Sequence, residues 1–555
     1  MQIPRRRYRV PVVLVANGLV LAFMLSCCNP GTTSHAGLTI CAVDATRATS
    51  FPAQACSTGA IAATGAAQDF QITATSSDGK PLANTALSVK VSGANATSGS
   101  VTTGADGSAT YSYSGSAAGT DTISVALAQG STALKHPATI HWLKPHALKH
   151  PIVWVHGIQE DAADFAHRID PTVSDFDQAS DASEQTYSAL IEGLTTIYDP
   201  QYLEAFCYAD DAAWVHNASA CPDGDAQTCD ATAPATSTTA CISQSSVYTN
   251  AKLLAAVVQQ LYARAGGAAP ITLVAYSMGG AIVRTLLAGC LNTPGGAPDP
   301  ACATAASEIA SVFFLDGAQQ GSWLLMAKEG VDVSSLSGDN IPVISSSPFL
   351  SVLPLVEPRI YSIVNAKLGL NLNDGAETDL TPQSANYRNQ NSVPPAANAQ
   401  IYTFYGDIRF GLDVQVLLYT VPAKVYLPMG DLVMLAQNDD PQATPLWGGG
   451  SLCGGCGSLP DDGYHAAGNF HAWALTQRVT ININGLTSLL AATDVPSDFD
   501  QVINSPVQHL NVAQPGTQSP GSPIQVHDAT GLAGSQTTDI PFEILLILMH
   551  GDGLI

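Results

Sequence analysis

The pattern of apolar residues changes near residue 150, and this change constrains the fold more than any other feature of the chain. Before it, short runs alternate apolar and polar residues and are separated by turn dipeptides such as Asp78-Gly79 and Asp106-Gly107. After it, continuous apolar runs alternate with segments that repeat apolar residues at helical spacing. Alternating runs indicate strands with one buried face, whereas continuous runs indicate strands buried on both faces. The pattern therefore predicts an all-β unit followed by an α/β unit.

Residues 66–143 have the features of a small β-sandwich. Four short runs of alternating apolar and polar residues occur there, at 70–74, 87–91, 109–113 and 122–127. Strands at this spacing, divided by turn signals, are typical of sandwiches. Residues 29–65 are rich in Ala, Thr, Ser and Gly without sustained periodicity, and we expect a linker or stalk there.

Residues 150–500 have the features of an α/β domain. A helix is expected at 248–264, where apolar residues recur at helical spacing. A second helix is expected at 279–291, where small residues follow a strand. Because strands and helices alternate, we expect a mostly parallel sheet with helices on both faces. The strands are predicted by continuous apolar runs at 151–155, 271–276, 311–315 and 401–405.

Three further segments do not follow the strand-helix alternation. Residues 159–247 contain four cysteines and few apolar runs, so we expect an insertion that forms a surface cap. Residues 322–398 form a second expected insertion, either a lid, an acyl-chain trough or an extra core element. Residues 501–555 are a C-terminal extension, whose apolar run at 540–549 we expect to be a strand.

The charge of the chain excludes one class of partner. Lys and Arg total 21 against 45 Asp and Glu, which gives a formal net charge of −24. Such an acidic surface repels phosphate backbones and anionic lipid headgroups. We therefore expect no nucleic-acid partner.

The N-terminus has the three parts of a secretory signal. Residues 1–9 are basic, residues 10–25 are apolar, and small or sulfur-containing residues follow, so we assign residues 1–28 to a signal peptide. The sequence Met-Leu-Ser-Cys at 24–27 also resembles a bacterial lipobox, in which the cysteine is acylated. We expect a secreted protein, or a lipoprotein of the cell surface or outer membrane that is attached through acylated Cys27.

Ten cysteines remain beyond the signal, and an even number indicates a disulfide framework in an exported protein. Proximity along the chain predicts the pairs Cys41–Cys56, Cys290–Cys302 and Cys453–Cys456. The glycine-rich flanks of the last pair favour a cross-linked loop over a zinc site. Four more cysteines are expected to pair among themselves, namely Cys207, Cys221, Cys229 and Cys241.

Ser277 is the candidate nucleophile. It lies in the run Ala275-Tyr276-Ser277-Met278-Gly279-Gly280, between an expected strand and an expected helix. A serine hydroxyl that attacks carbonyls needs a tight strand-to-helix turn, where neighbouring residues must be small because the backbone passes close to itself. The alanine and the two glycines meet this requirement. An ordinary turn between strand and helix is the alternative.

Two backbone amides are candidates for an oxyanion hole. Met278 begins the expected helix, where N–H groups lack intrahelical partners and can bind an oxyanion. The second donor should come from a loop after an earlier strand, and Val155-His156-Gly157-Ile158 is such a loop. Its glycine lets the backbone turn its amides inward, which makes Ile158 the expected donor.

These motifs resemble two known families. Residues from about 150 to 480 are similar to α/β-hydrolase lipases, because the A-x-S-x-G form around Ser277 and the His156-Gly157 loop match those of small bacterial lipases. The turn residues at 78–84 and 102–110 resemble bacterial immunoglobulin-like domains of the invasin and intimin type. The resemblances imply an α/β-hydrolase fold preceded by a small all-β immunoglobulin-like sandwich.

The lipase resemblance implies that an acid and then a histidine follow Ser277 along the chain. His471 is the expected base because an apolar run with helical character comes directly after it, and His465 is its rival. Asp431 is the expected acid, since Gly430-Asp431-Leu432-Val433 resembles the lipase G-D-G-x-V loop without its second glycine. Asp407 and Asp316 each follow an expected strand and are the alternatives, and any of the three could instead cap a turn.

The resemblance implies acyl transfer. Ser277 would attack an ester carbonyl while His471 accepts its proton and Asp431 orients the imidazole. The amides of Ile158 and Met278 would hold the oxyanion, and neither a metal nor a cofactor would be required. We expect a carboxylic ester hydrolase of the lipase type, whose ester or lipid substrate can be insoluble. A polyester depolymerase, an acyltransferase and an inactive hydrolase-like surface adhesin remain open.

Overall fold

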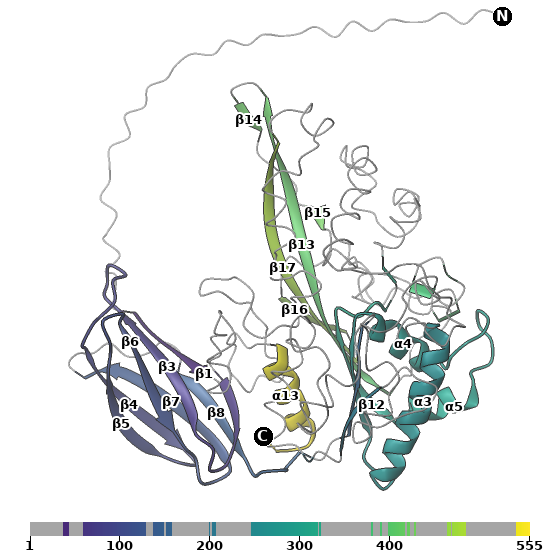
Figure 1. Ribbon diagram of the computed structural model, residues 1–555, viewed down its shortest axis with the longest axis horizontal. Coiled ribbons are helices and arrows are strands. Elements are labelled where there is room, and N and C mark those ends of the chain that lie inside the picture. The colour runs from purple at the N-terminus through teal and green to yellow at the C-terminus, as the bar shows by residue number, and fades with distance from the viewer. Residues whose placement is uncertain are drawn as a thin grey trace, which may run out of the picture.

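The computed structural model contains an all-β unit and an α/β unit, which are consecutive along the chain (Figure 1). The structure describes residues 37–43, 59–128, 137–148, 151–157, 199, 202–206, 246–319, 321–322, 379–380, 384, 389–390, 398–416, 419–421, 427–428, 463–467, 469–483 and 540–554. The predicted signal, acylated Cys27 and every predicted disulfide except Cys290–Cys302 involve residues outside these ranges.

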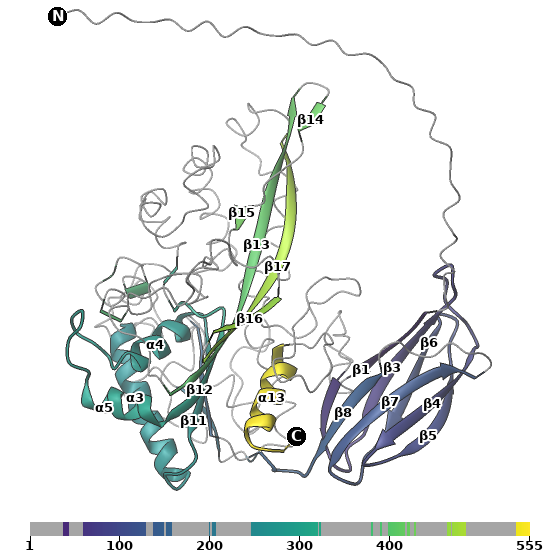
Figure 2. The same ribbon diagram turned by 180° about the vertical axis from the view of Figure 1, so that it is seen from behind.

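The all-β unit is a sandwich of two sheets, seen side on in Figures 1 and 2. One sheet has the antiparallel order β1-β3-β6, formed by Gly37–Val43, Gln68–Thr75 and Ser108–Tyr113. The other has the order β2-β8-β7-β4-β5, formed by Gly59–Ala63, Ala138–Leu143, Gly119–Leu127, Ala86–Gly93 and Thr97–Thr102. Within this second sheet, β2 and β8 are parallel and the other pairs are antiparallel.

Apolar side chains from both sheets fill the core of the sandwich. Phe70 and Ile72 from one sheet pack with Val89, Ile123 and Trp142 from the other, and all five are buried. The alternation of buried and exposed residues along β4 is the period-2 pattern from which its strand was predicted. The four strands expected from this pattern are present as β3, β4, β6 and β7.

The expected linker at 29–65 is wrong in part, because β1 and β2 both lie within it and belong to the two sheets. The reason lies in the size of the buried residues. The buried positions of β2 include Ala60, Ala62 and Ala63, whose small side chains produce little hydrophobic periodicity. Tertiary pairing with β8, rather than local pattern, therefore makes β2 a strand.

The α/β unit is built on a nine-stranded mixed sheet with the main order β10-β9-β11-β12-β13-β17-β16. The first six strands in this order are parallel, and β16 is antiparallel to β17. They comprise Leu203–Ala205, Ile152–Val155, Ile271–Tyr276, Ile309–Leu315, Gln400–Val416, Phe470–Ile483 and Gly463–Ala467. Two short strands, β14 (Tyr419–Val421) and β15 (Leu427–Pro428), pair with β13.

The expected strands of the parallel sheet are confirmed as β9, β11, β12 and the start of β13. Every residue of β9 and β11 is buried, as expected of strands covered on both faces. Strand β10 lies inside the stretch 159–247 that was expected to be an insertion. Residues 203–205 therefore belong to the main sheet and not to a surface cap.

Three helices lie together on one side of the sheet, namely α3 (Val247–Arg264), α4 (Met278–Leu287) and α5 (Pro300–Glu308) (Figures 1 and 2). Helix α13 (Ile540–Gly551) lies on the other side of the sheet, toward the sandwich (Figures 1 and 2). The expectation of a strand at 540–549 is wrong. Ile544, Leu546, Leu548 and Met549 are all buried, and such residues point to several sides of a helix. A short run that is apolar on every side has no period that distinguishes helix from strand.

Part of the second expected insertion is fixed to α3. The carboxylate of Asp379 accepts hydrogen bonds from the Ser246 hydroxyl at 2.8 Å and from the Val247 amide at 3.0 Å, so it caps the N-terminus of the helix. Burial raises the pKa of the Asp379 carboxyl above its ordinary value, against the effect of these hydrogen bonds. Most of the lid or acyl-chain trough expected within 322–398 lies outside the described ranges.

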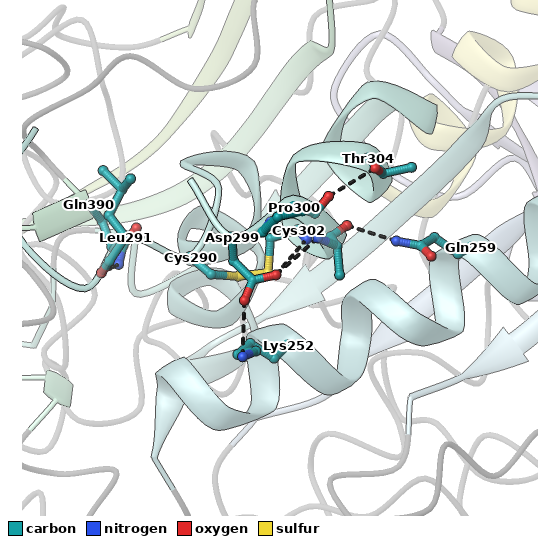
Figure 3. The surroundings of a disulfide bond; sticks show 10 residues. Lys252, Gln259, Cys290, Leu291, Asp299, Pro300, Cys302, Thr304 and Gln390 are labelled. Atoms are coloured by element: carbon teal, nitrogen blue, oxygen red, sulfur yellow. Dashed lines mark hydrogen bonds and ion pairs between the residues drawn. A yellow bond between two sulfur atoms is a disulfide. The ribbon is translucent and has the colours of Figure 1, made fainter. Parts of the chain in front are cut away.

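A disulfide between Cys290 and Cys302, one of the predicted pairs, joins the end of α4 to α5 (Figure 3). Between the two cysteines, Asp299 caps α5 by accepting from the Ala301 amide and pairs with Lys252 of α3 at 3.0 Å. The side chain of Gln390 donates to the carbonyl of Leu291 at 3.2 Å. These contacts hold α3, α4 and α5 together as one layer.

No helix among the described residues has both the length and the apolar character needed to cross a membrane.

The disulfide generates a prediction about stability. Replacing both cysteines, Cys290→Ala and Cys302→Ala, should lower the free energy of unfolding of the α/β unit by about 3 kcal/mol, because the unfolded chain regains the entropy of an open loop. Urea unfolding without reductant measures this change. Fully reduced wild-type protein is the control and should unfold at nearly the same urea concentration as the double variant. An unchanged midpoint in the variant would contradict the prediction.

Candidate active site

Ser277 lies between β11 and α4 in a backbone conformation that side chains rarely adopt. Its φ is +50° and its ψ is −123°, and about nine tenths of the surface of Ser277 is buried. A non-glycine residue in this region costs on the order of 1–3 kcal/mol and persists only where its surroundings enforce it. Residues with such strain cluster at active sites, so the conformation marks Ser277 as a functional candidate.

The two glycines after Ser277 allow the turn to pack against neighbouring strand ends. A Cβ on Gly279 would lie 2.2 Å from the carbonyl oxygen of Val155 and 2.8 Å from that of His156. A Cβ on Gly280 would lie 2.5 Å from the Cα of Gly317. Because these obstacles are backbone atoms, neither position accepts a side chain without movement of the chain.

Hydrogen bonds hold the turn in place. The carbonyl oxygen of Ser277 accepts from the amide of Gly280 at 2.9 Å and from the amide of Ala318 at 2.8 Å. The second bond joins the turn to the segment that leaves β12. The small-residue requirement deduced from the sequence is thus met by direct contact with the ends of β9 and β12.

One half of the expected oxyanion hole has a suitable position. Met278 is the first residue of α4, so its amide belongs to the helix turn whose N–H groups have no intrahelical acceptor. The His156-Gly157 segment follows β9, and the carbonyl oxygen of His156 lies against Gly279. His156 is fully buried, and its Nδ1 donates to the carbonyl of Gly157 at 3.0 Å. Ile158, the expected second donor, lies outside the described residues.

The three candidate acids lie in different places. Asp316 directly follows β12, is fully buried and has a φ of +44°. Asp407 is part of β13, one residue after Gly406, whose amide donates to the Asp316 carboxylate at 2.9 Å. Asp431 lies outside the described residues. The structure therefore brings Asp316 next to the Ser277 turn and places the backbone of Asp407 nearby.

His471 and His465 both lie in strands. The helix expected after His471 is wrong, because β17 extends from Phe470 to Ile483. The physical reason is a long parallel pairing with β13, in which His471 is opposite Tyr402 and their rings stack with centroids 4.8 Å apart. His465 lies in β16, opposite Ala472.

The structure does not bring His471 to Ser277. Strand β17 is the third strand from β11, and a spacing of about 4.8 Å between neighbouring strands separates the two by about 14 Å. Through the registers of β13 and β12, His471 is also level with Val274, three residues before Ser277. Burial lowers the pKa of the His471 imidazole below its ordinary value, so the neutral ring is favoured at pH 7.

The sequence named Asp316 as an alternative acid, but it did not reveal that the segment Asp316–Gln319 packs against the Ser277 turn. Its glycine contacts Gly280 and its alanine amide binds the carbonyl of Ser277. Asp-Gly directly after a buried strand drew attention to Asp316, but that dipeptide is common in ordinary turns and does not specify which turn it contacts. Among the described residues, no group of three or more His, Cys, Asp or Glu side chains is arranged to hold a metal ion.

No family model and no curated protein matches the chain. Among solved structures, the D00-D0 domain of intimin is similar over 20% of this chain and 48% of its own, with 21% identity and a TM-score of 0.15. The mature form of Bacillus licheniformis lipase BlEst2 is similar over 67% of this chain and 90% of its own, with 14% identity and a TM-score of 0.29. The chain spans about half the length of the intimin fragment it matches. These similarities assign no family to the chain.

The close packing at the turn predicts the effect of one added methyl group. Gly280→Ala should destabilise the protein by about 1–3 kcal/mol, because its Cβ would overlap the backbone of Gly317. Gly551→Ala is the matched control, since nothing lies within 4 Å of the Cβ that it would add. Thermal unfolding of both variants tests the prediction, and equal effects would contradict it.

Proposed function

We propose that the protein is a serine carboxylic ester hydrolase of the lipase type, which forms an acyl-enzyme on Ser277. The strained conformation of Ser277 on a strand-turn-helix element carries this proposal. Such a turn places the serine hydroxyl at the carboxyl end of a parallel sheet, beside the first amides of a helix. The two glycines that permit the turn support the same conclusion.

The proposed reaction begins when the Ser277 hydroxyl oxygen bonds to the ester carbonyl carbon. The serine proton passes to a general base and then to the departing alcohol, and the carbonyl electrons collect on the oxyanion. The Met278 amide at the start of α4 stabilises that oxyanion, with Ile158 as the proposed second donor. Water then cleaves the acyl-enzyme and releases the carboxylic acid.

The assignment of a general base and an acid to Ser277 has weaker support than the assignment of Ser277 itself. A general base must come within hydrogen-bond distance of the serine hydroxyl. His471 and Asp431 are the partners that the sequence favours, but His471 stacks on Tyr402 three strands from β11. The proposal therefore depends on Ser277 and its turn, and substitution of His471 tests the part played by that residue.

The proposal also covers the location of the protein and the class of its substrate. The signal-like N-terminus favours a secreted or lipid-anchored protein, and the Cys290–Cys302 disulfide supports an oxidising compartment. A formal net charge of −24 favours neutral ester substrates over anionic phospholipids. We propose a neutral ester or lipid, soluble or insoluble, as the substrate class.

A fluorophosphonate probe tests the nucleophile directly. The wild-type protein should gain one probe adduct on Ser277, detected by intact mass and peptide mapping, whereas Ser277→Ala should gain none. Hydrolysis of p-nitrophenyl esters by Ser277→Ala should fall by roughly 10⁴- to 10⁶-fold. Ser277→Gly should be equally inactive but more stable than Ser277→Ala, because glycine accepts a φ of +50° without strain.

Correctly folded wild-type protein that never reacts with the probe would remove the proposal and favour an inactive, adhesin-like role. If the probe reacts, comparison of soluble esters, emulsified triglyceride and polyester films identifies the substrate class.

The role of His471 can be tested by a substitution that keeps an aromatic ring at this position but removes the imidazole. From its position in β17 we expect His471→Phe to keep ester turnover within about tenfold, since a phenyl ring can also stack on Tyr402. A general base at this position would instead make the loss about 10⁴-fold. His471→Ala, which removes the ring, is the control for the contribution of stacking to stability.

The same variant has a pH-dependent readout. Because the pKa of His471 is lowered on folding, the wild type should lose stability as pH falls from about 6.5, and His471→Phe should lose less over that range. Unfolding midpoints at several pH values measure the difference, and parallel profiles would contradict it.

A further inference from the structure

The turn that follows β12 is bound to β13 through Asp316. The backbone amide of Asp316 donates to the carbonyl of Phe404 at 2.9 Å, and its carboxylate Oδ1 accepts from the amide of Gly406 at 2.9 Å. Regular pairing of β12 with β13 ends at Leu315 and Phe404. The Asp316 side chain thus binds β13 just beyond the point where the backbone of β12 turns away.

The conformation of Asp316 allows this arrangement. Its φ of +44° redirects the chain immediately after the strand, while its side chain remains fully buried. Aspartate tolerates the left-handed region better than most residues, because its short polar side chain can bind local backbone groups. Gln319, three residues later, adds a second link to β13 by donating from Nε2 to the hydroxyl of Thr403 at 3.2 Å.

The same turn supports the conformation of Ser277. The amide of Ala318 donates to the carbonyl of Ser277 at 2.8 Å, and Gly317 lies directly against Gly280. Any displacement of the turn after β12 therefore displaces the backbone that leads from Ser277 into α4. A shift of about 1 Å in a catalytic group can reduce a rate by about 10²-fold.

We propose that Asp316 is a positioning residue: its carboxylate fixes the turn after β12 to Gly406 and thereby holds Ser277 in its reactive conformation. This inference rests on the proposed function of Ser277. It assigns Asp316 a different task from the acid of a catalytic triad, whose carboxylate must accept from the Nδ1–H of the base and remain ionised. The positioning role requires only an oxygen that accepts from a backbone amide, so an asparagine can perform it.

Asp316→Asn and Asp316→Ala separate the two roles. Asp316→Asn keeps an acceptor oxygen at the same place, and we expect its kcat for a p-nitrophenyl ester to stay within about tenfold of wild type with an unchanged pH profile. Asp316→Ala removes the acceptor, and we expect kcat and the rate of probe reaction with Ser277 to fall by about 10²-fold with little change in KM.

Thr272→Val is the matched control. Thr272 is buried in β11 and its hydroxyl is 2.6 Å from that of Ser311 in β12, so the substitution breaks a hydrogen bond between β11 and β12 at their amino ends. It should lower the melting temperature while changing the rate of probe reaction less than threefold. This control distinguishes general destabilisation from loss of positioning at Ser277.

Each outcome has a defined meaning. A folded Asp316→Asn variant that loses about 10⁴-fold in kcat would overturn the proposal and identify Asp316 as the triad acid. An Asp316→Ala variant that reacts with the probe as fast as Thr272→Val would also overturn it. If Asp316→Ala does not fold, Asp316→Asn decides by its kcat alone. Failure of the wild type to react with the probe would reject the proposed function, a result distinguishable from all of these.

Discussion

Close contact between backbone segments at the ends of three strands is the constraint on which the candidate site depends. Gly279 rests on the carbonyl of Val155 at the end of β9, and Gly280 rests on Gly317 after β12. Neither contact leaves room for a Cβ, so the turn at Ser277 forms only where β9, β11 and β12 are neighbours. The sheet order places β11 between the other two strands. The order of the strands in the sheet therefore also determines the geometry of the candidate site.

The surroundings of the turn provide the rigidity that a strained serine requires. Helix α4 starts at the turn, is buried along its whole length and is tied at its far end to α5 by the Cys290–Cys302 disulfide. Asp379 caps α3, which packs beside α4 and α5. The disulfide and the packing of α3 and α5 therefore support the helix that begins at Ser277. The strain at Ser277 is offset by packing of the layer as a whole.

The sequence predicted some elements of the structure correctly and missed others, depending on how distinctive the local pattern of residues was. Continuous apolar runs located β9, β11 and β12, and the A-x-S-x-G run located the Ser277 turn, because each depends on residues that are adjacent in the chain. The pairing of Cys290 with Cys302 followed from a separation of 12 residues. Strand β2 was missed because its buried residues are mostly alanine, and α13 was misassigned because a run that is apolar on every side has no readable period.

The amino-acid sequence by itself determined where the strands with strong patterns lie, that two structural units follow one another, and that Ser277 has neighbours small enough for a tight turn. These properties are local, since they depend on side-chain size and apolar spacing over a few residues. Only the tertiary structure decided that β13 and β17 pair over a long parallel register, which places His471 beside Tyr402. It also decided that Asp316 binds the amide of Gly406, a contact across 90 residues of chain. Such contacts depend on which strands become neighbours, and no local pattern specifies that choice.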